Sequence, residues 1–252
     1  MVDFISTMID LVTKYQSLLW MGIYRTLILG IVGTVVGLII GLIVGALRVI
    51  CVKHEPSESS VVRVIKWIVN AIMNIYITIF RGTPMMVQAM IIYFGVFDMG
   101  LQWDPFVAGL VVISINTGAY MAEIIRAGIQ SIDAGQEEAA RSIGMSGMQA
   151  MRYVVLPQAI RNSFPSIGNE LIVNIKDCCT LSTIMITELF YQARTIAGST
   201  YKTVPAYMIA AIIYLILTSL ASFIMKKLEK RINHTESNYF SSSTVVENME
   251  NR

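Results

Sequence analysis

The sequence has few charged residues, few histidines and few cysteines. Asp, Glu, Lys and Arg make up 14% of the 252 residues and 55% are hydrophobic, so an ordinary soluble domain is excluded. The two histidines and three cysteines (Cys51, Cys178, Cys179) show no metal-type spacing and no disulfide framework. The phosphate-binding pattern G-x-x-x-x-G-K-[ST] is also missing. We therefore expect no metal, no bound cofactor and no ATP binding by that route.

Long uncharged runs predominate instead. Thr26–Leu47 has no charge over 22 residues and would form a helix of about 33 Å, enough to cross a bilayer. Small residues recur at every fourth position of this run and predict a bare face for close helix packing. These residues are Gly33, Gly37, Gly41 and Gly45.

Three further apolar regions predict additional membrane spans. Trp67–Phe97 exceeds one straight crossing, and Pro84 is expected to break its helix. Pro105–Ala122 and Thr203–Met225 are each long enough for one crossing.

The charge distribution decides whether Ser163–Gln192 also crosses. Lys and Arg concentrate after the first, third and last spans, whereas the loop after the second has only Asp98 and Asp104. Since basic loops stay cytoplasmic, Ser163–Gln192 must cross for Lys226–Arg231 to lie inside. We therefore predict an all-α membrane protein with about five transmembrane helices, the N-terminus outside and the C-terminus inside.

A crossing segment with ionisable residues has to face other helices or a water-filled cavity. If Ser163–Gln192 is one helix, its polar positions fall on one stripe. The stripe consists of Glu170, Asn174, Asp177, Leu181 and Glu188. These groups either pair with bases on other helices, Arg81 being a candidate, or line a translocation path, the role that we favour for Asp177.

The polar segment of about 133–157 predicts a helical hairpin on the cytoplasmic side. Asp133 and Gln136 are a capping pair, and Gly144 is a natural helix end, so a helix is expected over about Ala134–Ile143. Ser146 and Gln149 form a second capping pair, which starts a helix that Pro157 interrupts. Judged by shape alone, such a hairpin is either a connector or a docking element.

Four motifs resemble those of one transporter family. Glu138-Ala139-Ala140, Gly144 and Leu156-Pro157 have the spacing of the EAA loop of ABC-importer permeases. Phe80–Gln88 resembles the FRGTPLLVQ run of the polar-amino-acid branch, and Asn116–Ile124 with Arg126 resembles its NTGAYxAEIxR segment. Leu156–Ala159 matches LPQA, and Lys176-Asp177 opens a KDTSL-like run. The resemblance covers roughly residues 20–230.

The resemblance implies a type I ABC importer permease, similar to histidine and glutamine permeases and without enzyme activity of its own. It implies ATPase coupling through Glu138, Ala139, Ala140, Gly144, Leu156 and Pro157. The expected partners are two cytoplasmic ATP-binding subunits that hold ATP and magnesium, a second permease subunit (the same or a homologous chain), an extracytoplasmic amino-acid-binding protein and membrane lipid. No nucleic-acid partner is expected, and the location is the bacterial cytoplasmic membrane.

Departures from the family pattern bear on the substrate. Family members often have an acidic residue where this chain has Thr78, which argues weakly against a strongly basic substrate. Asp177 remains available to accept an α-ammonium group, and Arg81 is a candidate partner for the carboxylate. The pathway candidates are thus Asp177, Arg81, Thr78, Asn174, Glu170 and Glu188.

The expected organisation has three parts. An amphipathic helix in residues 1–20 would lie on the membrane, residues 21–231 would form the permease domain, and residues 232–252 would be a disordered cytoplasmic tail. Two other functions remain open at this point. The chain could be an ion-coupled secondary transporter using Asp177 and Glu188, although inverted repeats are not found, or a membrane scaffold subunit that does not pump.

Overall fold

Every regular element of the described chain is helical. The computed structural model describes residues 2–52 and 59–250, with side-chain surroundings for 3–52 and 59–232, and no strand occurs in these ranges. The α-helices are α1 (Val2–Lys14), α2 (Gln16–Val52), α3 (Ser60–Gly82), α4 (Met85–Asp98), α5 (Pro105–Gln130), α6 (Ala134–Ser142), α7 (Gly147–Ala150), α8 (Leu156–Asp177), α9 (Leu189–Thr200) and α10 (Thr203–Glu250). A π-helical turn, η1 (Met151–Val155), precedes α8, and a 3-10 segment, η2 (Cys178–Ile184), follows it. The all-α prediction is confirmed.

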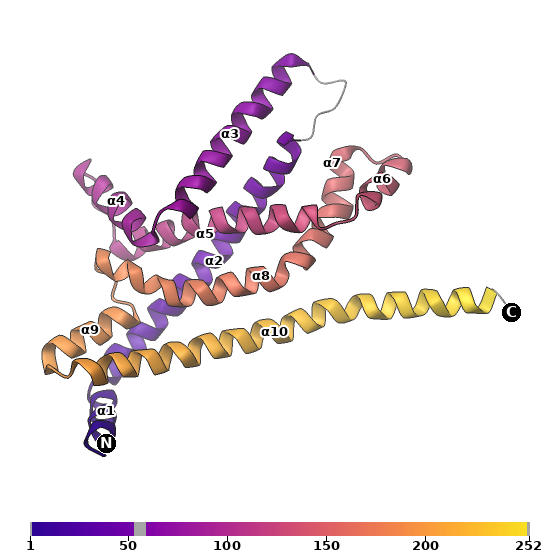
Figure 1. Ribbon diagram of the computed structural model, residues 1–252. Coiled ribbons are helices and arrows are strands. Elements are labelled where there is room, and N and C mark those ends of the chain that lie inside the picture. Colours follow the sequence, from indigo (N-terminus) through magenta and orange to yellow (C-terminus); the bar gives the residue numbers. More distant parts are fainter. Residues whose placement is uncertain (1, 53–58, 251–252) are drawn as a thin grey trace.

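Successive long helices run in opposite directions. Figure 1 shows α2, α5 and α10 running one way and α3 and α8 running back. Four of them, α2, α3, α5 and α10 as far as Ile232, are long and apolar enough to cross a membrane. The more polar α8 is not among these four, but it packs against α2, α5 and α10 and runs antiparallel to them (Figure 1). Five antiparallel passes agree with the predicted crossings, whereas their orientation in the membrane stays a prediction.

The glycine face of α2 forms the contact with α5, as its spacing predicts. A Cβ atom added to Gly37 would lie 2.7 Å from the Thr117 Cβ, and one added to Gly33 would lie 2.6 Å from the Ile113 side chain. Since real Cβ atoms do not approach other atoms so closely, only glycine allows these two helices to pack at this distance.

Pro84 separates α3 from α4, which confirms the predicted break. Its ψ of 136° is extended, and α3 ends two residues earlier, at Gly82. The break leaves carbonyl groups without helical partners. The Gln88 amide donates to the carbonyls of Phe80 and Thr83 at 3.0 and 2.9 Å, and the Asn116 amide donates to Phe80 at 3.1 Å.

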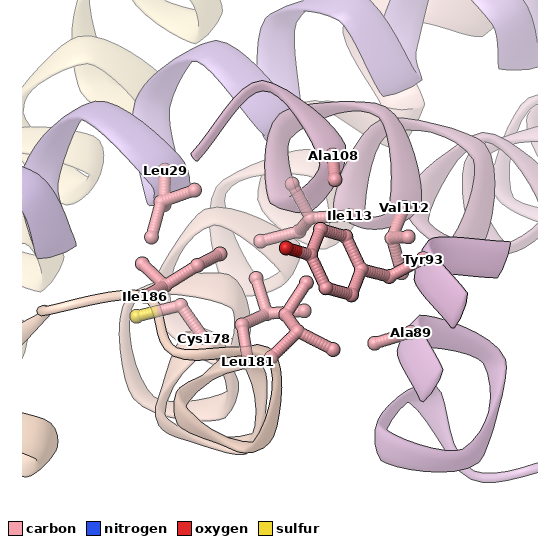
Figure 2. Packing of buried hydrophobic residues seen from close by; sticks show 10 residues of the cluster. Leu29, Ala89, Tyr93, Ala108, Val112, Ile113, Cys178, Leu181 and Ile186 are labelled. Atoms are coloured by element: carbon pink, nitrogen blue, oxygen red, sulfur yellow. The ribbon is translucent and has the colours of Figure 1, made fainter. Parts of the chain in front are cut away.

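The apolar core around this break joins four elements. Figure 2 shows Leu29 of α2, Tyr93 of α4, Ile113 of α5 and Leu181 of η2 packed against one another. Cys178 is fully buried in the same cluster, so this cysteine is a small core residue. The cluster holds the short α4 and the 3-10 segment against the long helices.

The single helix expected over Ser163–Gln192 is wrong, because α8 ends at Asp177. The hydroxyls of Thr180 and Thr183 bond the carbonyls three residues before them, at 2.8 Å each, which favours 3-10 over α-helical winding. Met185 then adopts a left-handed conformation with φ of 65°, and Glu188 starts α9. Glu188 therefore does not share a helical stripe with Glu170.

The described part of the chain begins and ends in a helix. In α1, Leu11 packs with α9 and α10, while Ile5 and Ile9 are exposed; the interfacial position of this amphipathic helix stays a prediction. The backbone of α10 continues to Glu250, through most of the segment expected to be a disordered tail. Whether residues 232–252 are disordered at the membrane stays a prediction.

Candidate functional site

The predicted hairpin of residues 133–157 projects from one end of the helical bundle, as Figure 1 shows for α6 and α7. The Asp133 carboxylate accepts a hydrogen bond from the Gly135 amide at 2.7 Å and starts α6. The helix ends at Ser142, one residue short of the predicted Ile143. The Gln136 side chain accepts from Gln158 of α8 at 3.4 Å rather than bonding the cap residue, so it joins the two arms of the hairpin.

The turn of the hairpin depends on one glycine and one capping box. Gly144 has φ of +91°, a conformation that side chains disfavour, and no atom lies within 4 Å of where its Cβ would be. The Ser146 hydroxyl accepts from the Gln149 amide, and the Gln149 side chain accepts from the Ser146 amide. Both predictions for the turn are confirmed.

Pro157 changes the winding of the second arm without ending it. The turn η1 is π-helical, with the Leu156 amide bonded to the Met151 carbonyl, and α8 follows directly with Pro157 in its first turn. A proline has no amide hydrogen and its ring clashes with the carbonyl four residues earlier, which a widened π turn relieves. The predicted interruption is therefore a local widening of a continuous helix.

The predicted coupling residues divide into a surface group and an interior group. Glu138, Ala139, Gly144 and Pro157 are exposed, whereas Ala140 is buried and Leu156 is half-buried. Large apolar side chains are also exposed on the hairpin and at its base, and the sequence analysis does not select them. They are Ile143 (77% exposed), Met148 (59%) and Tyr153 (62%).

Three predicted pathway residues are linked by electrostatic interactions that centre on Glu170. Arg81 is in the last turn of α3, and Glu170 and Asp177 are seven residues, or about two turns, apart on α8. Glu170 is half-buried and interacts electrostatically with both Asp177 and Arg81. One cation and two carboxylates therefore lie near one another, and Thr78 is exposed one turn before Arg81.

The other two predicted pathway residues make structural contacts in this conformation. Asn174 is buried, donates to the Thr34 hydroxyl of α2 at 2.8 Å and accepts from the Thr117 hydroxyl of α5 at 3.1 Å. The carboxylate of Glu188 is fully buried, accepts from the Phe190 and Tyr191 amides at the start of α9, and accepts from the Tyr214 hydroxyl at 2.7 Å.

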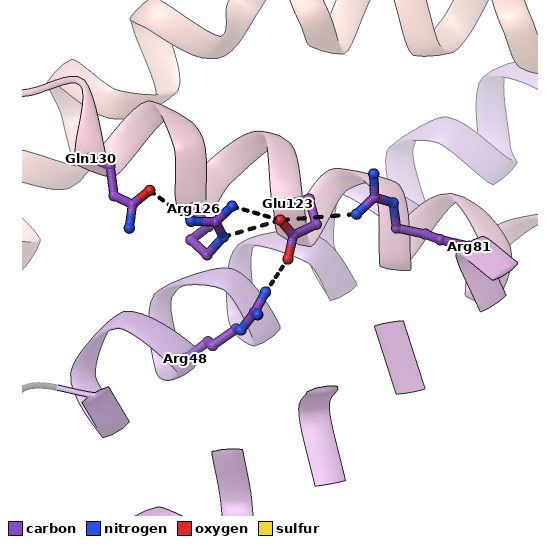
Figure 3. A network of polar contacts seen from close by, with 5 residues as sticks. All are labelled: Arg48, Arg81, Glu123, Arg126 and Gln130. Atoms are coloured by element: carbon purple, nitrogen blue, oxygen red, sulfur yellow. Dashed lines mark hydrogen bonds and ion pairs between the residues drawn. The ribbon is translucent and has the colours of Figure 1, made fainter. Parts of the chain in front are cut away.

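One charged cluster is missed by the sequence analysis. Figure 3 shows Glu123 of α5 surrounded by Arg48, Arg81 and Arg126. Arg48 pairs with one carboxylate oxygen, and Arg126 pairs with the other at 2.8 Å. One signal in the sequence could have indicated this cluster. Glu123 directly follows the predicted end of the third span at Ala122, and because α5 continues to Gln130, Glu123 lies within the helix and not in a loop.

The comparisons with known proteins agree with one another. Residues 59–234 match the family described as binding-protein-dependent transport system inner membrane component. The chain is 40% identical over 169 residues to the glutamine transport system permease protein GlnP of Escherichia coli strain K12, covering 66% of this chain and 77% of that protein. It is 42% identical over 160 residues to a putative GlnP of Rickettsia typhi, covering 63% of this chain and 73% of that protein.

Two solved structures share the fold. The crystal structure of an amino acid ABC transporter with histidines has a TM-score of 0.77 and 38% identity, covering 92% of this chain and 99% of that chain. An inward-facing MetNI methionine ABC transporter has a TM-score of 0.72, covering 87% of this chain and 98% of that chain; at 20% identity it supports the fold alone.

Proposed function

The chain belongs to the family of binding-protein-dependent transport system inner membrane components, and we propose that the hairpin of residues 133–157 couples it to ATPase subunits. It is the transmembrane permease subunit of an ATP-driven amino-acid import system and a multi-pass protein of the bacterial cell membrane. The relatives do not favour an ion-coupled transporter or a scaffold subunit.

The shape of the hairpin supports the proposal that it couples the permease to the ATPase subunits. The helix α6 is fixed by a cap at its start and by a glycine turn at its end, and it stands clear of the bundle (Figure 1). Exposed apolar side chains that are grouped on a polar surface are typical of a protein-binding site. Ile143 and Met148 supply such side chains, and Glu138 and Ala139 are exposed on the adjacent helix. We therefore assign the ATPase contact to this surface.

Contacts inside the hairpin give a route from α6 to the pathway. Ala140 is buried, its carbonyl accepts from the Met145 amide at 3.2 Å, and α6 packs on η1. Because η1 continues directly into α8, a displacement of α6 would be transmitted to the helix that carries Glu170 and Asp177.

The proposed substrate is a polar amino acid without a strong positive charge. The cluster of Arg81, Glu170 and Asp177 has both signs of charge that a zwitterion needs. The GlnP relatives make glutamine the first substrate to test. Thr78, in place of an acidic residue, argues against a strongly basic substrate.

The proposed assembly contains two ATP-binding subunits, a second permease subunit and an extracytoplasmic binding protein. ATP and Mg²⁺ would be bound by the ATP-binding subunits and not by this chain. In this assembly the end of the bundle that carries α6 faces the cytoplasm.

Uptake by proteoliposomes tests the proposal. Proteoliposomes that contain the permease and its ATP-binding subunits, supplied with the binding protein, should take up L-glutamine only when ATP and Mg²⁺ are present on the side of the membrane that carries the ATP-binding subunits. Glu138→Trp should abolish uptake while the permease stays folded. Ser199→Trp, at an exposed position in the last turn of α9 and away from the hairpin, should leave uptake unchanged. Uptake driven by an ion gradient alone, or normal uptake by Glu138→Trp, would contradict it.

A further inference from the structure

Glu123 has more positive partners than one carboxylate can satisfy at close range. Arg126 bonds it through two nitrogens, at 2.8 and 3.1 Å, and Arg48 bonds its other oxygen. Arg81 approaches the same carboxylate only to 3.9 Å. Glu123 alone therefore cannot neutralise all three arginines, and Arg81 has a second acidic partner in Glu170 of α8.

Arg81 is the least tightly held of the three. Its side chain is 42% exposed, compared with 23% for Arg48 and 30% for Arg126. Its guanidinium lies over the Tyr120 ring, 5.4 Å from the ring centre. The backbone beside it is fixed, because Gln88 and Asn116 both bond the Phe80 carbonyl. Arg81 is therefore the most exposed arginine of the cluster and has the longest ion pair, while its backbone is held by hydrogen bonds next to it.

A groove of mixed polar and apolar lining lies beside Arg81. Its volume is about 480 Å³, and α3, α5 and α8 line it with Arg81, Tyr120, Glu123, Arg126, Asn162 and Ser166. At its far end the Asn162 amide donates to the Ser131 hydroxyl at 3.2 Å, just before α6. The residues that line the groove therefore include Arg81 of the charged cluster and Asn162, which is bonded to the segment that precedes the hairpin.

We propose that this groove is an exit station for the transported amino acid and that Arg81 is its latch. In the empty groove Arg81 rests on Tyr120 and pairs with Glu123; when the amino acid arrives, Arg81 exchanges Glu123 for the α-carboxylate. The exchange costs little free energy, because the Arg81–Glu123 pair is long, at 3.9 Å, and because Arg48 and Arg126 continue to neutralise Glu123. Glu123 then serves as a positioning residue. This inference rests on the proposed function, in which Arg81 belongs to the substrate pathway.

The charge of the groove can be measured without knowing the substrate. Ser166 is exposed and lines the groove, so Ser166→Cys offers a thiol for labelling. The probes are an anionic and a cationic methanethiosulfonate reagent, applied to the permease–ATPase complex in inside-out vesicles. Labelling of the native cysteines in the parent chain is subtracted. Lys227→Cys, exposed on α10 and outside the groove, is the control site.

The ratio of anionic to cationic labelling at Ser166→Cys should fall about 5-fold with Arg81→Gln and rise about 5-fold with Glu123→Gln, with no change at Lys227→Cys. Glu123→Asp should restore the original ratio if Glu123→Gln folds poorly. L-Glutamine should slow labelling at Ser166→Cys, and L-glutamine amide, which lacks the carboxylate, should not.

A ratio that is insensitive to both charge changes would overturn the latch. A responsive ratio, but no protection by L-glutamine in a complex that imports it, would overturn the exit station. These results differ from failure of the proposed function, which would appear as missing ATP-driven uptake by the parent complex while the labelling ratios still respond.

Discussion

The side-chain amide of Asn116 donates to Gln88 across the α4–α5 contact, at 2.8 Å, and the same amide reaches the Phe80 carbonyl. This pair helps to satisfy the carbonyl groups that the break between α3 and α4 leaves without helical partners. The motif runs that contain Asn116 and Gln88 therefore have a structural explanation: together they hold Arg81 in place.

Asn116→Ala should lower the free energy of unfolding of the purified permease by about 1 kcal/mol, because it leaves the side-chain amide oxygen of Gln88 buried without its donor. Thermal unfolding in detergent measures the loss. Ser114→Ala, which removes a neighbouring buried hydroxyl of the same helix, is the matched control and should have a smaller effect. Equal losses would mean that the amide network adds little.

Gly37→Leu should destabilise the permease by about 2 kcal/mol or more, because the new side chain would overlap Thr117 of α5. Gly95→Leu on α4, where no atom lies within 4 Å of the added Cβ, should be tolerated. Chemical denaturation in micelles compares the two. A well-folded Gly37→Leu protein would show that α2 and α5 can separate.

Gly144→Ala should reduce the number of amino acids imported per ATP hydrolysed. Its φ of +91° is unfavourable for alanine, by about 1 kcal/mol, so the hairpin turn would shift although no contact is lost. Gly198→Ala on α9, also without neighbours, should behave as the parent. An unchanged transport ratio for Gly144→Ala would show that the hairpin tolerates the change.

Glu188→Gln should retain most of the uptake, because an amide oxygen can still accept from the α9 amides. Glu188→Leu removes the cap and the Tyr214 bond, and should reduce the amount of folded protein. Membrane yield and uptake per folded permease separate the two effects. Loss of uptake in well-folded Glu188→Gln would place its charge in the pathway instead.

Asp177→Asn should reduce uptake at least about 10-fold while leaving assembly with the ATPase intact, as expected if its charge contacts the substrate ammonium. Asp177 is exposed at the end of α8, so the substitution should not disturb packing. Co-purification of the ATP-binding subunits checks assembly. Their loss would give Asp177 a structural role.

Local signals were sufficient wherever the chain's own neighbours determine the conformation. Asp133, Gly144 and Ser146 define the hairpin through contacts within a few residues, and Pro84 breaks its helix by its own ring. The close-packing face of α2 could also be predicted from the sequence, because close helix packing needs small residues whichever helix is the partner.

Contacts between distant segments were not readable from one sequence. The end of α8 at Asp177 was missed for a different, local reason, because the hydroxyls of Thr180 and Thr183 bond nearby carbonyls within an otherwise helical pattern. Glu188 caps α9 locally through the Phe190 and Tyr191 amides, but its bond from Tyr214, 26 residues later, depends on how α10 packs. Glu123 could be recognised as a centre of charge only once α2 and α3 had brought Arg48 and Arg81 to it.

The seam between α2 and α5 limits how the permease can move. No side chain fits between these helices at Gly33 and Gly37, and Asn174 bonds both of them to α8. We therefore expect these three helices to move together when the permease changes conformation. The helix breaks at Pro84 and Met185 are the places where we expect the attached segments to bend relative to them.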